Sequence, residues 1–314
     1  GNALAVADAL VAAEMDGQSG HGLSRVPYYA AQSASGKVNG HAMPCAEQVG
    51  DAAWRIDACH GFAYPAIDLA IEKLLATAPG SVIGIATVFH SHHAGQAGYH
   101  VERLARRGLL GLLFSNTPRA IAPWGGTQPL FGTNPIACAV PRATRGPLVI
   151  DTSLSRVARG KIMLADREGR RLPEGWALDA RGQPTSDPGE ALSGSLLPMG
   201  EAKGAALALM VEILAAALSG ALFGFEATSF FTGDGAPPGV GQTLIAIDPE
   251  PLAAGTFATR LETLLDAILA QQGTRLPGAG KAARRERALR EGIVCPASLH
   301  EELLQLAAPT ARQS

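Results

Sequence analysis

The chain has 314 residues, of which 47% are hydrophobic and 17% are charged, and its formal net charge is −2. This composition suffices for a large buried core, in one big domain or two interleaved ones. The charge balance argues against a nucleic-acid partner, and no apolar run reaches membrane-spanning length, so we expect neither nucleic acid nor membrane.

The cysteines and the start of the chain indicate the cellular compartment in which the protein is expected. Cys45, Cys59, Cys138 and Cys295 are scattered and form no C-x-x-C pair. Reduced thiols in a cytoplasmic protein are the simplest account of this spacing. No signal peptide is recognisable, because Gly1 opens directly into a helical pattern, and we expect the natural chain to begin earlier.

Apolar spacing and helix breakers predict the elements in chain order. Helices are expected at 2–16, 27–36, 65–75 (broken at the latest by Pro79-Gly80), 99–107, 203–218, 257–271, 282–290 and 299–307. Strands are expected at 54–58, 81–89, 109–114, 136–140, 147–150 and 243–247, and long loops at 166–200 and 232–241.

The segment from 81 to 114 reads strand, helix, strand, which predicts parallel strands joined by a crossover. Ligands bind at the carboxyl ends of such strands. This places His90–His93 and Ser115–Pro118 in a candidate site. The alternation His90-Ser91-His92 is compatible with metal binding, but no carboxylate or cysteine is nearby in sequence to complete a ligand set, and we expect no metal.

Gly20-His21-Gly22-Leu23-Ser24-Arg25 is the most informative segment, since it places an imidazole and a guanidinium close together among glycines. A histidine exchanges protons near neutral pH, and an arginine holds a carboxylate through two parallel hydrogen bonds. The pair suits redox chemistry on a carbon next to a carboxylate. The alternative is a surface loop with an incidental histidine.

Three further segments carry polar groups at the ends of apolar runs. The amide of Asn134, after Thr133, either orients a substrate carbonyl or closes its turn. Asp151 ends an apolar strand, where it contacts a cofactor, orients a histidine or caps a helix. Lys203-Gly204 opens a long apolar helix, whose free N–H groups suit a phosphate or ribose.

The C-terminal part holds two weaker patterns. Gly278-Ala279-Gly280-Lys281 resembles a dinucleotide fingerprint, but too little chain follows it for the required strands and helices, so a Rossmann domain is not supported. The basic run 281–287 contains Glu286 and helix formers, which favours a solvated helix face over a binding patch.

Several long blocks, in order and over nearly the whole chain, resemble the malate/L-lactate dehydrogenase family, which includes ureidoglycolate, sulfolactate and diketogulonate oxidoreductases and Δ1-piperideine-2-carboxylate reductases. The blocks are GHGLSRVPYY, SHHAGQAGY, NTPRAIAPWGG, LFGTNPIA, VIDTS followed by ARGKI, PEGWALDARGQPTSDP, LLPMGEAKGAALALMVEIL and RLPG.

The resemblance implies an α/β fold that binds NAD(P)H without a Rossmann motif, with a mixed sheet and a helical part that mediates homodimerisation. The implied parts are 1–95 together with 245–314 for substrate and dimerisation, and 96–244 for the cofactor. It leaves NADH and NADPH unresolved; Arg119, Arg156 and Arg159 are candidates for the group near the ribose.

The resemblance also implies roles for individual residues. His21 corresponds to the proton donor, Arg25 to the arginine that grips the substrate carboxylate, and His93 to the second active-site histidine. Asp151 is a catalytic candidate as well as a cofactor contact, and Arg119, Thr133 and Asn134 are taken as further substrate contacts. The remaining expected cofactor contacts are His92, Thr152, Ser153, Lys203, Gly204 and Gly278.

Three positions depart from the family pattern: Gly20 replaces a common Ser, Ala94 replaces Phe, and Glu201-Ala202 replaces Gly-His or Gly-Tyr. The expected function is an NAD(P)-dependent oxidoreductase of a small 2-oxo or 2-hydroxy carboxylate. One alternative is a reductase of cyclic imines such as Δ1-piperideine-2-carboxylate or Δ1-pyrroline-2-carboxylate. The other is a non-catalytic binding protein that has kept the fold.

Overall fold

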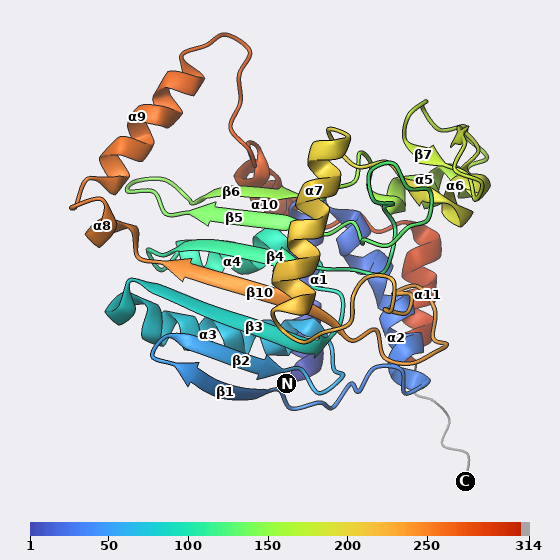
Figure 1. Ribbon diagram of the computed structural model, residues 1–314, viewed down its shortest axis with the longest axis horizontal. Helices are drawn as coiled ribbons and strands as arrows, with labels where there is room; N and C mark the ends of the chain where they lie inside the picture. The colour runs from blue at the N-terminus through green and yellow to red at the C-terminus, as the bar shows by residue number, and fades with distance from the viewer. Residues whose placement is uncertain (309–314) are drawn as a thin grey trace.

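The computed structural model describes residues 1–308 and shows an α/β fold built on a seven-stranded mixed sheet (Figure 1). The strand order is β1-β2-β3-β10-β4-β5-β6, with β2 and β3 parallel and every other neighbouring pair antiparallel. The strands are β1 Cys45–Gly50, β2 Ala53–Asp57, β3 Ile83–Ser91, β4 Leu110–Ser115, β5 Ile136–Val140, β6 Leu148–Thr152 and β10 Val240–Ile247.

Strand β10 changes the predicted topology at the centre of the sheet. Strands β3 and β4 run in the same direction and are joined through a helix, but β10 lies between them and is antiparallel to both. They are therefore not neighbours, because a strand from much later in the chain inserts there. Their carboxyl ends still share one edge, since Ser91 pairs with Val240 and Ser115 pairs with Gln242.

Helices cover both faces of the sheet. α3 (Ala63–Ser81) and α4 (Ala97–Ala105) lie behind it, and α7 (Ala202–Val211) crosses the front (Figure 1). The larger core fills the face under α3 and α4, and a smaller one fills the face under α7. The other helices are α1 Asn2–Met15, α2 Val26–Ala34, α8 Pro249–Leu252, α9 Phe257–Leu269, α10 Lys281–Glu291 and α11 Ala297–Ala307.

A small lobe occupies most of the predicted long loop at 166–200. It contains a three-stranded sheet, two helices and its own apolar core. Its strands are only two residues long, so they leave no hydrophobic period in the sequence. The elements are α5 Arg159–Arg167, β7 Ala177–Leu178, β8 Pro184–Thr185, α6 Pro188–Ser193 and β9 Ser195–Leu196.

Two predicted helices differ in detail. α3 continues through Pro79 and ends two residues later at Ser81, although proline has no N–H to bond to the carbonyl four residues earlier. The predicted helix at 203–218 is α-helical as far as Val211 and then becomes a π-helical turn, η3, over Glu212–Ala217. Such turns are often found at functional sites.

The predicted division into parts stays a prediction, and β10 runs across the boundary expected at 244/245. Within residues 1–308, the structure contains no helix with both the length and the apolar character needed to span a bilayer.

Candidate active site

The segment around His21 folds as two consecutive 3-10 turns, η1 Ser19–His21 and η2 Leu23–Arg25, between α1 and α2. Glu14 fixes the junction, because its Oε1 accepts a hydrogen bond from the backbone N–H of Leu23 at 2.8 Å. A Cβ at Gly22 would lie 2.3 Å from the same oxygen, so only glycine fits there, whereas nothing lies within 4 Å of a Cβ at Gly20.

His21 and His93 stack face to face, with ring centroids 5.3 Å apart and an angle of 19° between the planes. Burial, followed by the neighbouring Arg25 guanidinium, lowers the pKa of His21 to about 4. The same two causes hold the pKa of His93 well below its ordinary value. The structure therefore joins two predicted site residues into one pair of neutral imidazoles at neutral pH.

Arg25 lies beside this pair and is only 8% exposed. Its Nε donates a hydrogen bond to the carbonyl of Gly20 at 2.7 Å, and its guanidinium carbon lies 4.6 Å from the ring centroid of Phe231. Its Nη1 is buried and has no hydrogen-bond partner within the described chain. A buried cationic donor without a partner is what an anionic ligand would satisfy.

An aromatic and polar shell holds the two histidines at the end of β3. Tyr29 contacts Nδ1 of His93 at 2.6 Å, and the Phe230 ring packs against both His92 and His93. Gln32 donates to the carbonyl of Phe230 and takes a hydrogen bond from Nε2 of His92 at 2.8 Å. Burial, followed by nearby cations, lowers the pKa of His92 to about 3.

Sequence reasoning missed the segment 229–232, which ends where the predicted loop at 232–241 begins. Lys37 is buried, and its Nζ donates to the carbonyls of Ser229 and Thr232, which ties this segment to α2. Phe230 and Phe231 are thereby held against the histidines and Arg25. The available signal was the aromatic pair in a segment otherwise rich in glycine and polar residues.

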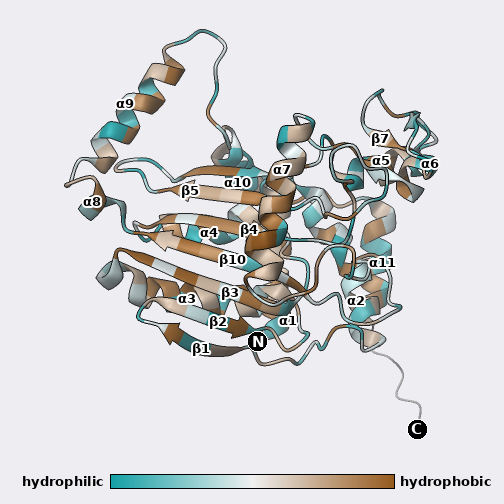
Figure 2. Cartoon of the chain, in the orientation of Figure 1, coloured by the Kyte–Doolittle hydropathy of each residue, from teal (hydrophilic) through white to brown (hydrophobic). Residues whose placement is uncertain are grey.

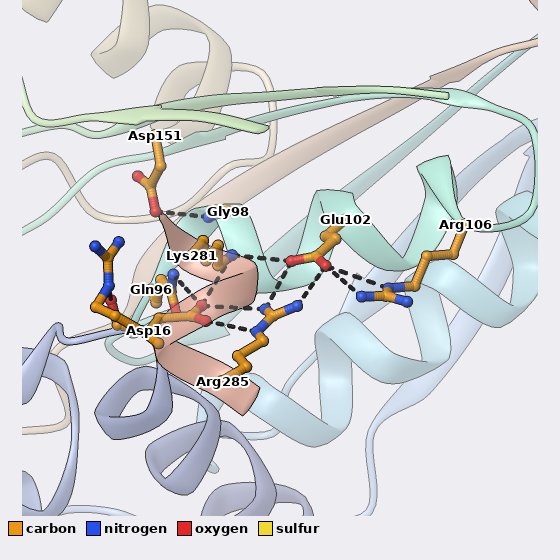
Figure 3. A network of polar contacts seen from close by, with 9 residues as sticks. Asp16, Gln96, Gly98, Glu102, Arg106, Asp151, Lys281 and Arg285 are labelled. Carbon is orange, nitrogen blue, oxygen red and sulfur yellow. Dashed lines mark hydrogen bonds and ion pairs between the residues drawn. The ribbon is translucent and has the colours of Figure 1, made fainter. Parts of the chain in front are cut away.

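Asp151 lies at the carboxyl end of β6, as expected, and its Oδ2 accepts a hydrogen bond from the N–H of Gly98 at 2.8 Å (Figure 3). Burial raises its pKa, although this hydrogen bond and Lys281 act in the opposite direction. Its hydrogen bond goes to the start of α4 rather than to an imidazole. Within the described chain, no hydrogen bond links it to a histidine.

The basic run 281–287 is mostly exposed, as predicted, but two of its cations, Lys281 and Arg285, are partly buried and paired. Lys281 and Arg285 both form ion pairs with Asp16 of α1 and with Glu102 of α4, at 2.6–2.9 Å (Figure 3). Burial opposes ionisation of Glu102, but hydrogen bonds from Arg285 and Lys281 lower its pKa to about 2. Sequence patterning could not show that the partners lie some 180 and 270 residues earlier.

A cavity of about 420 Å³ adjoins this network. It lies between Leu148–Val149 of β6 and the Gly278–Gly280 turn, and a Cβ at Gly278 would lie 3.2 Å from the carbonyl of Val149. Six basic side chains and one acidic side chain line it: Arg106, Arg142, Arg145, Arg275, Lys281, Arg285 and Glu102. Its electrostatic character favours an anion.

The other expected cofactor contacts gather near the end of β6. Thr152 is exposed and Ser153 is half-buried. Met199 donates its N–H to the carbonyl of Leu154, which brings the start of α7, with the exposed Lys203, next to this strand. A Cβ at Gly204 would lie 1.8 Å from the carbonyl of Met199, so glycine is required where α7 begins.

Asn134 closes its turn, which was one of the two alternatives. It is fully buried, with a left-handed φ of 43°. Its amide nitrogen donates to the carbonyl of Ala208 and to Glu212, and its oxygen accepts from the N–H of Thr117. No amide group is left to orient a substrate.

The remaining two expected substrate contacts differ in exposure. Thr133 is half-buried, and its backbone N–H donates to the hydroxyl of Thr117. Arg119 is exposed, and its side chain makes no hydrogen bond or ion pair within residues 1–308. In that same part of the chain, no group of three or more His, Cys, Asp or Glu side chains is placed to hold a metal ion.

Comparisons with known proteins agree with this architecture. The sequence model of the malate/L-lactate dehydrogenase family matches residues 1–304. The chain is 51% identical to the (2R)-3-sulfolactate dehydrogenase (NADP(+)) of Chromohalobacter salexigens, over 95% of this chain and 88% of that protein. It is 41% identical to the Δ1-pyrroline-2-carboxylate/Δ1-piperideine-2-carboxylate reductase of Pseudomonas syringae pv. tomato, over 96% of this chain and 88% of that protein.

Solved structures show the same similarity. The crystal structure of Δ1-piperideine-2-carboxylate reductase from Pseudomonas syringae superposes with a TM-score of 0.92 at 41% identity, covering 97% of this chain and 92% of that one. The sulfolactate dehydrogenase from Methanocaldococcus jannaschii superposes with a TM-score of 0.88 at 30% identity, covering 98% and 90%.

Proposed function

Because the chain belongs to the malate/L-lactate dehydrogenase family, we propose that this NAD(P)-dependent oxidoreductase acts at the 2-carbon of a small 2-oxo or 2-hydroxy carboxylate. The observation that carries the proposal is the buried Arg25 guanidinium, whose Nη1 lacks a partner beside the stacked His21 and His93. A carboxylate would satisfy Arg25 and place the neighbouring carbon next to both imidazoles.

The chain's own residues bind, orient and move a proton. When bound, the nicotinamide cofactor supplies or accepts the hydride. Arg25 holds the carboxylate, and Phe230 and Phe231 keep water from the pair of imidazoles. Neutral His21 is in the form that takes the hydroxyl proton during oxidation. During reduction, anionic ligands favour its protonation, and it returns that proton.

The residues that fit the cofactor lie from the end of β3 to the cavity beside Gly278. The cations of this cavity, beside the amino end of β6, fit the phosphates of a dinucleotide, and Asp151 and Ser153 lie at the carboxyl end of the same strand. His92 has a buried Nδ1 without a partner within the described chain, which fits a hydrogen-bond donor on a ligand. We propose NADPH as the preferred cofactor, given the 51% identical sulfolactate dehydrogenase that uses NADP(+).

We propose sulfopyruvate or another 2-oxo acid with a second anionic group as the first substrate to test, given the 51% identical sulfolactate dehydrogenase. Reduction of a cyclic imino acid is the second candidate, supported by the 41% identical reductase and its superposition on this chain. The two differ in the acceptor atom, which is a carbonyl oxygen in one case and an imine nitrogen in the other.

We further propose a cytoplasmic homodimer. All four cysteines are free. The outer side of α7 and η3 carries exposed apolar side chains, among them Leu209, Met210 and Ile213, and brown segments run along α7 in Figure 2. Apolar surface of this kind marks an interface. Light scattering of the purified protein would test the dimer, and Ile213→Glu should shift it toward a monomer.

The decisive experiment follows oxidation of NADH and NADPH with pyruvate, oxaloacetate, sulfopyruvate, 2,3-diketogulonate and Δ1-piperideine-2-carboxylate. We expect turnover of one of these with NADPH, and a loss of about 10²–10⁴ in kcat for His21→Ala. Wild-type turnover in that variant would overturn its role as proton donor. Absence of binding of either cofactor would favour a non-catalytic binding protein, the hypothesis raised by Gly20 and Ala94.

A further inference from the structure

A chain of three polar groups leads from α3 to the candidate active site. The Tyr64 hydroxyl of α3 lies 3.1 Å from the Tyr29 hydroxyl of α2, which in turn lies 2.6 Å from Nδ1 of His93. Tyr64 is 1% exposed and Tyr29 is 4% exposed, so water does not compete for these hydrogen bonds. Burial raises the pKa of Tyr29 to about 12 and that of Tyr64 well above its ordinary value, so each phenol carries one proton.

Tyr64, at the end of this series of hydrogen-bonded groups, determines which group donates to which. Within residues 1–308, the Tyr64 hydroxyl has no hydrogen-bond partner besides Tyr29. If His93 donated from Nδ1 to Tyr29, then Tyr29 would donate to Tyr64, and the buried Tyr64 proton would have no acceptor. If Tyr64 donates to Tyr29 and Tyr29 donates to Nδ1, both phenolic protons have acceptors.

The second arrangement leaves the one proton of neutral His93 on Nε2. This nitrogen makes no hydrogen bond within the described chain, and the His21 ring stacks against the same imidazole. A neutral imidazole that presents an N–H can polarise a carbonyl or imine without becoming charged. The tautomer thus determines whether His93 is a donor or an acceptor toward a ligand.

We propose that Tyr29, whose hydroxyl accepts from Tyr64 and donates to Nδ1, is a positioning residue that holds His93 as the Nε2–H tautomer, ready to donate a hydrogen bond to the atom on the substrate's 2-carbon. The role of this hydrogen bond in catalysis rests on the proposed function. The tautomer itself does not, because it follows from contacts within the free protein.

Nitrogen-15 NMR of histidine-labelled protein reads the tautomer directly, because protonated and bare ring nitrogens resonate far apart. His93→Gln assigns the signals. We expect a single Nε2–H tautomer for His93 in the wild type near neutral pH, and a mixture of tautomers in Tyr29→Phe, which removes the hydroxyl that contacts Nδ1. Tyr99→Phe is the matched control, since Tyr99 lies on α4, and its hydroxyl makes no hydrogen bond within the described residues.

Two NMR results would overturn the proposal: an Nδ1–H tautomer in the wild type, or an unchanged single tautomer in Tyr29→Phe. The wild-type spectrum suffices for the first test, even if a variant fails to fold. For turnover, we expect Tyr29→Phe to lower kcat about two- to tenfold, with the KM of the substrate unchanged. Turnover absent from the wild type would contradict the proposed function while the NMR result still stands.

Discussion

At the scale of single residues, the site combines one permanent charge with neutral imidazoles. Burial, followed by the positive charge of the Arg25 guanidinium, lowers the pKa of His21 and His93. A carboxylate on Arg25 would cancel that charge and relieve its effect on both rings. Binding of an acidic substrate and protonation of an imidazole should therefore favour each other.

Replacing Arg25 with lysine tests the geometry of this anchor rather than its charge. A lysine keeps the cation but lacks the planar fork that holds two carboxylate oxygens. We expect Arg25→Lys to raise the substrate KM about 10- to 100-fold and to change kcat much less, as steady-state kinetics would measure. Arg107→Lys, an exposed position at the end of α4, should leave both constants unchanged. A fall in kcat at constant KM would contradict the anchoring role.

Asn134 shows how much of the site could be predicted from the sequence. The sequence predicts a turn there, but it does not show that Glu212, 78 residues later, accepts a hydrogen bond from the Asn134 amide at 2.9 Å. Glu212 also accepts from Asn116 and from the N–H groups of Gly132 and Gly224. The buried carboxylate of Glu212, at the start of a π-helical turn, thus joins three loops. No local sequence pattern predicts these contacts.

Removing the Asn134 amide should affect folding rather than substrate binding. Asn134→Ala leaves Glu212 short of a donor and replaces asparagine, which tolerates the left-handed region, with alanine, which tolerates it less well, at a cost of about 2–3 kcal/mol. Thermal unfolding should show a lower Tm, while the substrate KM of the folded enzyme stays the same. Asn134→Gly, which removes the backbone strain, separates the two causes. A raised KM with an unchanged Tm would revive the substrate-contact hypothesis.

At the scale of elements, long segments with a clear hydrophobic period could be predicted from the sequence, but the strands with which they pair could not. The buried runs at 81–89 and 243–247 indicate strands, and both are strands in the structure. Their side-by-side pairing depends on contacts between segments 150 residues apart, which periodicity does not contain. The two-residue strands of the small lobe lie below the length at which any pattern appears.

The ion pairs of α10 give this helix a measurable role. Asp16 and Glu102 have side chains 1% and 7% exposed, and they hold Lys281 and Arg285 beside the Gly278 turn. We expect Glu102→Gln to lower the free energy of unfolding by about 1–3 kcal/mol, because Lys281 and Arg285 then share the single carboxylate of Asp16. It should also weaken NADPH binding, as fluorescence titration would show. Glu72→Gln removes an exposed ion pair with Lys73 and should change neither quantity.

At the scale of the whole molecule, the predicted site residues form two groups, and the fold assembles each group from distant segments of the chain. The structure brings His21, Arg25 and His93 together from α1–α2 and from the end of β3. It holds the Asp151 and Gly278 segments beside the first turns of α4, through Gly98 and the α10 ion pairs. The order of the motifs in the sequence could indicate that these segments share a function. Their arrangement around α4 could be seen only in the three-dimensional structure.

The buried histidines make the stability of the whole molecule depend on pH. Burial is the leading cause that lowers the pKa of His21 to about 4, of His92 to about 3 and of His100 to about 4, against 6.5 in the unfolded chain. The unfolded state therefore binds more protons between pH 6.5 and 4, so stability is complete above pH 6.5 and falls as the pH drops through this window. For His100 alone, the loss approaches about 3 kcal/mol below pH 4.

Thermal unfolding between pH 8 and pH 4.5 would measure this dependence. We expect a nearly constant Tm above pH 7 and a steep decline below 6.5. His100→Gln should make the decline shallower, because glutamine keeps a donor for the Ala94 carbonyl without titrating. His300→Gln, at an exposed position of α11, is the matched control and should leave the decline unchanged. A Tm that stays level down to pH 5 would show that these imidazoles accept protons in the folded protein, and the neutral His21–His93 pair would then no longer hold.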